Sequence, residues 1–388
     1  MRILQVIEFF SPKMGGSAQV AYQTARHLTR RGHHVTIWSS DYGQREASFP
    51  EGGFAVRLFS CSAASSGLYF TPGLAPYARR HLAQFDIVHM HNVRTFQNVV
   101  VGMFARRTGL PYVISPHGSL PRLMERKAAK RAFDLLLGNR LVRDAQRMIA
   151  VSAAEVEQFV QAGIPQKKIA LLPNGLDLEE FAELPSPGLF RRRLGLTDQV
   201  FLILFLGRIH RIKGINHLIT AFDQVKHRID NAHLVIAGPD DGDLGRLRSM
   251  AAQLSLEEQI IFTGPVYGQE KLSALVDASV VVLPSQYEIF GLVAFEALMC
   301  GTPVIATVES VVGQLLAAHN AGRIIPYGDP AKLAESLIES SITGPEQYLT
   351  AGRAYIQNQL DWNHITAALE EIYSGQPAPI NQHAVAKG

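Results

Sequence analysis

The sequence predicts an α/β protein with two doubly wound parallel sheets, and three observations support this prediction. Short runs rich in β-branched and aromatic residues alternate with helical patterns along the chain. Such alternation is typical of parallel sheets that carry helices on both faces. The length of 388 residues favours two domains over one. With 47% hydrophobic and 18% charged residues, the composition is that of an ordinary globular protein.

The expected strands fall into two similar sets. In the first half they occupy residues 2–9, 33–40, 85–91, 111–117, 147–152 and 168–173. In the second half they occupy residues 200–207, 233–238, 259–264, 279–285, 302–307 and 321–328. Each half therefore forms a complete doubly wound unit.

The boundary between the halves is expected near Pro185 and Pro187, which interrupt the pattern in a polar stretch. We therefore expect domains at 1–184 and 185–362, and a flexible tail at 379–388. Ligands of doubly wound sheets bind outside the carboxyl ends of the strands. Two such units that face each other would enclose an interdomain cleft.

Glycine and polar residues stand at several of these strand ends. They are Gly15, Gly16, His117, Asn174, Asp177, Arg208 and Glu288. Random placement would scatter such residues more widely, so their positions favour a common binding region.

The N-terminus and the cysteines favour a cytoplasmic protein. The first residues, MRILQVIEFF, have the pattern of a strand and not of a signal peptide. No apolar run approaches the roughly 18 residues of a membrane span. Cys61 and Cys300 form neither a disulfide framework nor a metal cluster, as expected in a reducing compartment.

The charge is distributed unevenly. Residues 1–180 have a formal charge of +9 and the remainder −6, and much of the surplus lies between residues 121 and 150. This basic run is either a solvated helix face or a surface that meets anionic lipid headgroups. Nucleic acid is a less favoured partner, because no aromatic residues are interleaved with the basic ones.

One acid stands alone in the apolar stretch from Ile289 to Val308. No Lys or Arg lies three or four positions from Glu296 to pair with it. A buried carboxylate without a partner is costly, so we expect Glu296 to bind a ligand. The vicinal diol of a ribose would satisfy it without any cation.

The strongest constellation combines residues 207–214, GRIHRIKG, with residues 288–296, EIFGLVAFE. Arg208 and Lys213 follow the first strand of the second half, where two cations can converge on a diphosphate. Gly291 marks the start of a helix, whose dipole favours the same anion.

Five further segments belong to the same pattern: CGTPVIA at 300–306, PHG at 116–118, VSAAE at 151–155, PNGLD at 173–177 and DW at 361–362. Together with the two segments above, they resemble the retaining glycosyltransferases of family 4 (group 1). The resemblance spans almost the whole chain. It implies the GT-B fold of two Rossmann-like domains, with a last helix at about 363–378 that packs back on the first.

The resemblance also implies catalytic roles for four residues. Arg208 and Lys213 would bind the diphosphate of a nucleotide sugar, and Glu288 would bind hydroxyls of the transferred sugar. His117 would lie beside that sugar near the reacting carbon.

The implied donor site is larger than this catalytic set. Glu296 would bind the ribose hydroxyls, and the loop of Gly15 and Gly16 would let the backbone approach donor and acceptor closely. Val266 and Lys271 match the family region near the base. The segment Ile289, Phe290, Gly291 and Leu292 completes the site.

The implied reaction moves a hexosyl group from a nucleoside diphosphate sugar to an acceptor hydroxyl with retention of configuration. A UDP-sugar is the first expectation and GDP-mannose the second. The acceptor would be a glycan or a lipid-linked molecule in assembly of cell-envelope polysaccharide, lipopolysaccharide or glycolipid. A nucleotide-sugar 2-epimerase and a non-catalytic nucleotide-sugar-binding protein remain as alternatives.

No cofactor and no metal are expected, because Arg208 and Lys213 supply the positive charge that a metal would bring. Asp241 and Asp243 have the D-x-D spacing that holds a metal in another glycosyltransferase class, but PDDGD at 239–243 is interpreted as a turn. His89 and His91 alternate on one strand face, and a structural or acceptor-binding role is favoured over zinc.

The stretch from Ala306 to Gly322 departs from the family pattern. Many members have two glycines followed by an acid there, whereas this chain keeps one glycine, Gly313. The contacts of this loop are therefore open.

Overall fold

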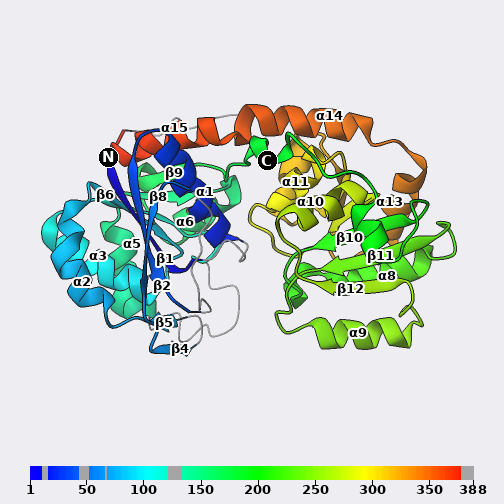
Figure 1. Cartoon of the computed structure of the whole chain (residues 1–388), viewed down its shortest axis with the longest axis horizontal. Coiled ribbons are helices and arrows are strands. Elements are labelled where there is room, and N and C mark those ends of the chain that lie inside the picture. Colours follow the sequence, from blue (N-terminus) through cyan, green and yellow to red (C-terminus); the bar gives the residue numbers. More distant parts are fainter. Residues whose placement is uncertain (11–15, 43–51, 66–67, 121–132, 377–388) are drawn as a thin grey trace. The chain divides into compact units, whose positions relative to one another are not determined.

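The computed structural model describes residues 1–10, 16–42, 52–65, 68–120 and 133–376 (Figure 1). The chain divides into two compact units: Met1–Gly175 with Trp362–Gly388, and Leu176–Asp361. The first division precedes the position expected at 184. The reason is that the Leu176 N–H donates to the Leu360 carbonyl oxygen (2.7 Å), and Leu176 also bridges to Asp361.

The sheet of the first unit has seven strands in the order β3-β2-β1-β6-β7-β8-β9. Every pair is parallel. The order reverses between β1 and β6, which makes this edge the switch point where ligands of such sheets bind. The bounds are β1 Arg2–Phe9, β2 His34–Ser40, β3 Ala55–Phe59, β6 Ile87–His91, β7 Tyr112–Ser115, β8 Arg147–Ala150 and β9 Ile169–Leu171.

Three strands of the first unit were not expected from the sequence. β3 lies at the sheet edge and is half exposed, with Arg57 in its centre, so it lacks the apolar run of a buried strand. β4 (Ala63–Ser65) and β5 (Leu68–Phe70) form a separate antiparallel pair of only three residues each.

Helices of the first unit cover the sheet, and two of them begin at polar caps. The Thr95 hydroxyl accepts from the Asn98 N–H (3.1 Å), and the Ser152 hydroxyl accepts from the Glu155 N–H (3.2 Å). The helices are α1 Ser17–Arg30, α2 Leu74–His81, α3 Phe96–Thr108, α5 Asn139–Asp144 and α6 Ala153–Gln161, with a wider turn at Asp134–Gly138.

The last helix, α15 (Trp362–Tyr373), belongs to the first unit and lies beside α1 (Figure 1). Trp362 stacks on His27 with ring centroids 5.3 Å apart. Glu370 pairs with Arg31 and with His33, each at 2.7 Å. Aromatic packing and ion pairing together fix this helix to the unit.

The sheet of the second unit has six parallel strands in the order β12-β11-β10-β13-β14-β15. Its order reverses between β10 and β13. The bounds are β10 Phe201–Leu206, β11 Ala232–Ala237, β12 Ile260–Gly264, β13 Val280–Leu283, β14 Val304–Thr307 and β15 Arg323–Ile325. All six were expected from the sequence, because most of their residues are buried and apolar.

The second unit contains eight α-helices: α7 Leu189–Arg193, α8 Ile215–Val225, α9 Leu244–Gln253, α10 Gly268–Asp277, α11 Leu292–Met299, α12 Val311–Ala318, α13 Pro330–Ile342 and α14 Glu346–Tyr355. Asp329 caps α13, which starts with Pro330 at its first position. Within the described part of the chain, no helix is both long and apolar enough to cross a membrane.

Candidate functional site

In the second unit, the loop after β10 lies against the loop after β13. Gly214 has φ +65°, and a Cβ there would come within 2.0 Å of the Pro284 carbonyl oxygen. Only glycine tolerates both constraints. The Gln286 N–H also donates to the Ile212 carbonyl oxygen (2.9 Å). The switch point of this sheet therefore brings two predicted site segments together.

Lys213 and Glu288 meet at this junction. The Lys213 ammonium group donates to the Glu288 carboxylate, and the two side chains are 13% and 23% exposed. Glu288 lies just before α11, which begins after Gly291 at φ +66°. A cation, a carboxylate and a helix N-terminus thus share one partly open place, where the cation and the helix dipole favour an anionic ligand.

Glu296 is not the unpaired acid that its neighbours in sequence suggested. Its Oε1 accepts from the Lys271 ammonium group at 2.8 Å, and the two side chains are 11% and 20% exposed. Lys271 lies on α10, so this partner was not visible at helical spacing. Burial lowers the pKa of Lys271, but the Glu296 carboxylate outweighs it and the net pKa is raised.

Arg208 is the exposed one of the four predicted catalytic residues. Its guanidinium group pairs with Asp241 (2.5 Å), so Arg208 and Lys213 lie in two separate ion pairs. Asp243 is buried and receives two hydrogen bonds from Arg246, at 2.7 and 2.8 Å. Each carboxylate of the D-x-D sequence therefore has an arginine partner.

The D-x-D segment is a turn. The Asp240 carboxylate accepts from the N–H groups of Gly242, Asp243 and Leu244. Among the described residues, no cluster of three or more His, Cys, Asp or Glu side chains has the arrangement of a metal site.

The apolar members of the predicted donor site differ in exposure. Val266 and Phe290 are buried, and Phe290 packs against Phe295 with ring centroids 5.3 Å apart. Ile289 and Leu292 are half-buried. Only the latter two side chains are partly open to a ligand.

The atypical segment between Ala306 and Gly322 forms the end of β14, α12 and a turn. The Ser310 hydroxyl accepts from the Gly313 N–H (3.1 Å) and donates to the Thr307 carbonyl oxygen (2.7 Å). A Cβ at Gly313 would lie 1.9 Å from that same carbonyl oxygen, so this glycine is required. The Val311 N–H donates to the Glu288 carbonyl oxygen (2.9 Å) and ties the segment to the site.

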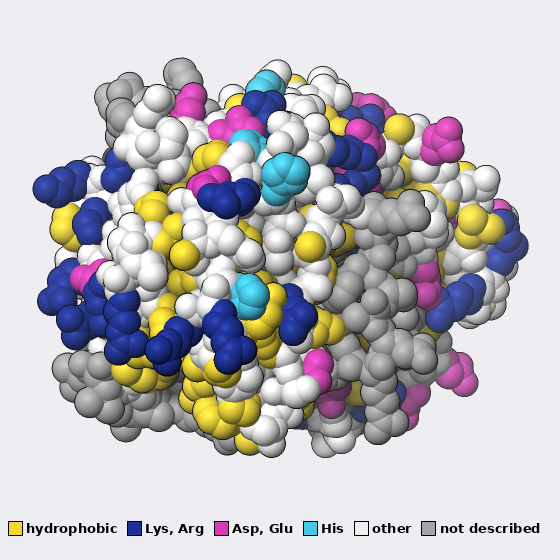
Figure 2. Space-filling model, turned by 60° about the vertical axis from the view of Figure 1, so that its left-hand side comes forward, with side chains coloured by type: hydrophobic (Ala, Val, Ile, Leu, Met, Phe, Trp, Pro, Cys, Tyr) yellow, Lys and Arg dark blue, Asp and Glu magenta, His cyan; other side chains and the backbone are white. Residues whose placement is uncertain are grey.

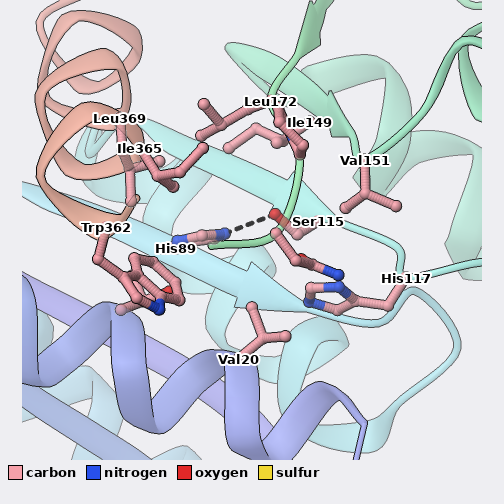
Figure 3. A pocket seen from close by; sticks show the side chains of 13 residues that line it. Val20, His89, Ser115, His117, Ile149, Val151, Leu172, Trp362, Ile365 and Leu369 are labelled. Atoms are coloured by element: carbon pink, nitrogen blue, oxygen red, sulfur yellow. Dashed lines mark hydrogen bonds between the residues drawn. The ribbon is translucent and has the colours of Figure 1, made fainter. Parts of the chain in front are cut away.

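In the first unit, His117 follows β7 in an uncommon backbone conformation with φ +50°. Its Nε2 is 2.9 Å from His91 Nδ1, and the two rings are nearly parallel. Figure 3 shows the His117 ring beside Ser115, at the end of the strand. Burial lowers the pKa of His117 to about 4, so the ring is neutral at pH 7.

His89 and His91 have hydrogen-bonding roles inside the unit. His89 lies between the Tyr373 hydroxyl (2.7 Å) and the Ser115 hydroxyl (2.8 Å), and His91 is bonded to Gln5 (3.0 Å). Burial lowers the pKa of His89 to about 3 and that of His91 well below its usual value. Both rings are therefore neutral.

Glu155 holds the backbone after His117, a role that the sequence did not reveal. Its carboxylate accepts from the Gly118 N–H (2.7 Å) and the Val151 N–H (2.8 Å), and the residue is fully buried. Burial raises its pKa to about 7 although both hydrogen bonds lower it. The only local signal in the sequence was the position of Glu155 three residues after Ser152, and this spacing indicates a helix start and not a contact with Gly118.

A small cavity of about 20 Å³ lies beneath His117 (Figure 3). Its polar lining includes His89 within β6, Ser115 at the end of β7 and Asn174 after β9. Its apolar lining includes Ile365 and Leu369 of α15. The volume is that of a single water molecule and not of a sugar.

The remaining predicted features of the first unit are only partly described. Gly16 has φ +69° and directly precedes α1, whereas Gly15 lies outside the described residues. Asp177 belongs to the second unit and caps a short turn by accepting from the Glu179 N–H (3.3 Å). It is therefore assigned to that turn and not to the strand-end group.

The basic run is likewise described only in part, because residues 121–132 lie outside the described residues. Arg106, Arg140 and Arg143 surround the single acid Asp144 at 3.5, 3.9 and 3.4 Å. Figure 2 shows Lys and Arg side chains gathered on one face with few acids between them. That face therefore carries an excess of positive charge.

Two family models match the chain. The model described as glycosyl transferases group 1 matches residues 189–359, and the model described as glycosyl transferase 4-like domain matches residues 15–175. The D-inositol 3-phosphate glycosyltransferase 1 of Catenulispora acidiphila is 33% identical over 302 residues, which cover 74% of this chain and 69% of the relative. The D-inositol 3-phosphate glycosyltransferase of Streptomyces scabiei is 31% identical, with 79% and 71% covered.

Solved structures show the same fold at lower identity. Anabaena Alr3699/HepE, solved in complex with UDP-glucose, has a TM-score of 0.80 and 22% identity, with 96% of this chain and 99% of that chain covered. Sucrose-phosphate synthase from Thermosynechococcus elongatus has a TM-score of 0.75 and 21% identity, with 96% and 98% covered. The fold is therefore GT-B, with a Rossmann-like sheet in each unit.

Proposed function

The chain belongs to the group 1 glycosyltransferases, and we propose that it transfers a hexosyl group from a nucleoside diphosphate sugar to an acceptor hydroxyl with retention of anomeric configuration. The observation that carries this proposal is the meeting of Lys213 and Glu288 at the start of α11. Lys213 supplies charge for the diphosphate, and Glu288 supplies an acceptor for sugar hydroxyls.

In the proposed donor complex, the diphosphate replaces Glu288 as the partner of Lys213. The released carboxylate then accepts hydrogen bonds from the transferred sugar. Arg208 is 60% exposed and exchanges Asp241 for the phosphate. The dipole of α11 stabilises the same negative charge.

Glu296 is proposed to bind the ribose with Lys271 as its structural partner. Lys271 contacts Oε1, so Oε2 remains able to accept from a ribose hydroxyl. Val266 and the half-buried Ile289 and Leu292 are proposed to lie near the nucleoside.

The proposed reaction exchanges one bond to the anomeric carbon for another on the same face of the sugar. The bond to the leaving diphosphate oxygen breaks, and the bond to the acceptor oxygen forms. The acceptor proton passes to an oxygen of the leaving phosphate. Lys213, Arg208 and the N-terminus of α11 stabilise the charge on this leaving group, and losing one such donor typically costs about 3–4 kcal/mol.

The donor is proposed to be a UDP-sugar, with GDP-mannose as the second choice. Alr3699/HepE, whose fold this chain shares, was solved with UDP-glucose, which supports a uridine donor. A thermal-shift panel of UDP, GDP and their sugars tests the choice. UDP and UDP-sugars should give the largest shifts, and a shift with GDP-mannose alone would contradict it.

The acceptor is proposed to be a glycan or a lipid-linked molecule of cell-envelope assembly, met at the inner face of a membrane. The arginines around Asp144 support contact with anionic headgroups. Relatives named D-inositol 3-phosphate glycosyltransferases point instead to a small phosphorylated polyol. Assays with D-inositol 3-phosphate and with lipid-linked glycan acceptors, each with and without anionic vesicles, distinguish the two.

Catalysis is proposed to need no metal, because the cationic side chains and the α11 dipole provide the charge for the diphosphate. Activity should survive a chelator. Loss of activity with a chelator and its return with manganese would assign that role to a metal and contradict this part of the proposal.

Product analysis tests the function itself. NMR of the product should show acceptor-dependent transfer and the anomeric configuration of the donor. Formation of a C2 epimer without acceptor would instead identify an epimerase. Nucleotide binding with neither product, across the acceptors above, would identify a binding protein.

A further inference from the structure

Three side chains form a hydrogen-bonded row that ends at His117. Gln5 lies on β1, His91 on β6 and His117 just after β7, so the row crosses three adjacent strands. Gln5 and His91 are fully buried. The His91 and His117 rings are tilted by only 3°, with centroids 5.3 Å apart, and His91 Nδ1 lies 2.9 Å from His117 Nε2.

The direction of this row follows from the surroundings of Gln5. One end of its amide faces both the Ala21 carbonyl oxygen (3.1 Å) and His91 Nε2 (3.0 Å). A carbonyl oxygen can only accept, so this end is the NH₂ group. The other end is then the oxygen, which accepts from the Ala25 N–H at 3.1 Å.

The same NH₂ group must donate to His91 Nε2. An imidazole nitrogen that accepts carries no proton, so the proton of neutral His91 is on Nδ1. That proton points at His117 Nε2, 2.9 Å away, which must accept it. Neutral His117 is left with its own proton on Nδ1.

We infer that His91, oriented by Gln5, is a positioning residue that holds His117 as the neutral tautomer with an unprotonated Nε2 and a proton on Nδ1. Within the described residues, His117 Nδ1 has no hydrogen-bond partner. It is therefore the nitrogen that is available to a ligand.

This inference gives His117 a chemical role, and here it rests on the proposed function. With Nε2 occupied by His91, the ring cannot take the acceptor proton through that nitrogen. It instead donates a hydrogen bond from Nδ1 to an oxygen of the substrate. The bond from Glu155 to the Gly118 N–H fixes the adjoining backbone, so the ring and its loop are held from two sides.

Nitrogen NMR tests the tautomer directly on the whole chain labelled with ¹⁵N-histidine and without substrate. Long-range proton–nitrogen correlations distinguish a protonated ring nitrogen from an unprotonated one. The His117 signals are those absent from a His117→Asn spectrum. At pH 7.5, His117 should show a protonated Nδ1 and an unprotonated Nε2.

Two variants test how the tautomer is selected. Gln5→Met keeps the side-chain length but removes the donor to His91 Nε2, so the His117 Nε2 shift should move toward the protonated range. Tyr373→Phe removes one buried hydrogen bond from the neighbouring His89 and should leave the His117 shifts unchanged. Fluorescence of Trp38 and Trp362, both buried in the first unit, confirms folding of each variant.

A His117 that is protonated on Nε2 or doubly protonated in the unmodified chain would overturn the inference. An unchanged His117 shift in folded Gln5→Met would also overturn it. Because no substrate is present, neither result depends on the proposed transferase activity. Failure of that activity in the product assay would leave the tautomer assignment standing.

Discussion

At the scale of single residues, the ion pair between Lys213 and Glu288 is a contact that the donor must break, because its diphosphate replaces Glu288 as the partner of Lys213. Both side chains are partly exposed, at 13% and 23%. A diphosphate offers Lys213 more negative charge than one carboxylate does. Binding of the donor therefore frees Glu288 for the sugar at the moment the sugar arrives.

We expect Lys213→Met to lower kcat by about 10²–10³-fold, because the leaving diphosphate loses a prearranged cation. Lys226→Met is a matched control, since Lys226 also lies beside α8 and pairs with Asp223 at 2.8 Å. Its kcat should stay within about twofold of the unmodified chain. Steady-state kinetics with UDP-glucose measure both, and a loss below about tenfold for Lys213→Met would contradict the assigned role.

Substitutions of Glu296 and of Glu288 should have different effects on the binding of UDP and UDP-glucose. Glu296→Gln should weaken UDP about tenfold, which corresponds to about 1.4 kcal/mol, because one charge-assisted hydrogen bond to the ribose becomes neutral. Glu288→Gln should not weaken UDP, because it removes the carboxylate that competes with the diphosphate for Lys213, and it should reduce the added affinity of UDP-glucose over UDP. Calorimetric titration measures all four values.

The exposed acid Glu257 provides the control for charge alone. Glu257→Gln should change neither Kd. If Glu288→Gln weakened UDP as much as Glu296→Gln does, the assignment of one acid to the sugar and the other to the ribose would be wrong.

At the scale of elements, the central strands of both sheets could be predicted because they are buried on both faces and have continuous apolar sequences. β3 lacks that signal, because it is half exposed at the sheet edge and has Arg57 in its centre, and it was therefore missed. The start of α11 was also predictable, because Gly291 marks the position where the loop after β13 turns into the helix. In the structure Gly291 has φ +66° and directly precedes α11.

Contacts between elements could not be predicted in the same way. Lys271 is 25 residues from Glu296, and Gln5 is 86 residues from His91. Such pairs depend on strand order and helix packing, which no local spacing encodes. The sequence therefore identified Glu296 as a notable acid but suggested a missing partner, whereas the fold supplies a lysine.

One such contact joins α7 to the end of α10. The Asp277 carboxylate accepts from the N–H groups of Gly188, Phe190 and Arg191, at 2.5, 2.7 and 3.0 Å. Arg191 in turn donates to the carbonyl oxygens of Asp277 and Val200. Asp277 and Arg191 are both buried, so this cap is closed to water.

Removing this carboxylate should destabilise the second unit. Asp277→Ala leaves three N–H groups without their acceptor and removes the negative charge that stabilises the buried Arg191 guanidinium group, and we expect a loss of about 3–5 kcal/mol. Asp223→Ala removes one acid of a more exposed pair and should change stability by less than about 1 kcal/mol. Hydrogen exchange of second-unit peptides measures both, and equal protection in the two variants would refute the role of the cap.

At the scale of the whole molecule, the two units can be followed separately. The chain has two tryptophans, Trp38 and Trp362, and both are buried in the first unit. Tryptophan fluorescence therefore reports unfolding of that unit alone. Its stability depends on pH through groups that burial has shifted in opposite directions.

Three buried histidines, His89, His91 and His117, have the largest effect on how the free energy of unfolding changes with pH. Burial lowers the pKa of His89 to about 3 and that of His117 to about 4, and it lowers the pKa of His91 well below 6.5. Between about pH 4.5 and 6.5 the unfolded chain therefore binds more protons than the folded one. Each histidine should raise the free energy of unfolding by up to about 1.4 kcal/mol per pH unit as pH rises through this range.

Glu155 acts with the opposite sign. Burial raises its pKa to about 7, so between about pH 4.5 and 7 the folded state keeps a proton that the unfolded state has lost. Its contribution therefore falls as pH rises and reduces the histidine slope. Burial also raises the pKa of Glu8, which therefore acts in the same direction. A substitution at Glu155 leaves this contribution of Glu8 to the pH dependence in place.

Urea unfolding of the first unit, followed by tryptophan fluorescence at pH 4.5, 5.5 and 6.5, should show stability rising with pH. In Glu155→Gln the rise should be steeper, because the opposing group is gone while the three histidines remain. Its absolute stability should be lower by about 1–2 kcal/mol at pH 6.5, since the amide can accept from only one of the Gly118 and Val151 N–H groups through its single oxygen. A shallower slope in Glu155→Gln than in the unmodified chain would show that the buried acid is ionised across this range and that its two backbone hydrogen bonds outweigh its burial.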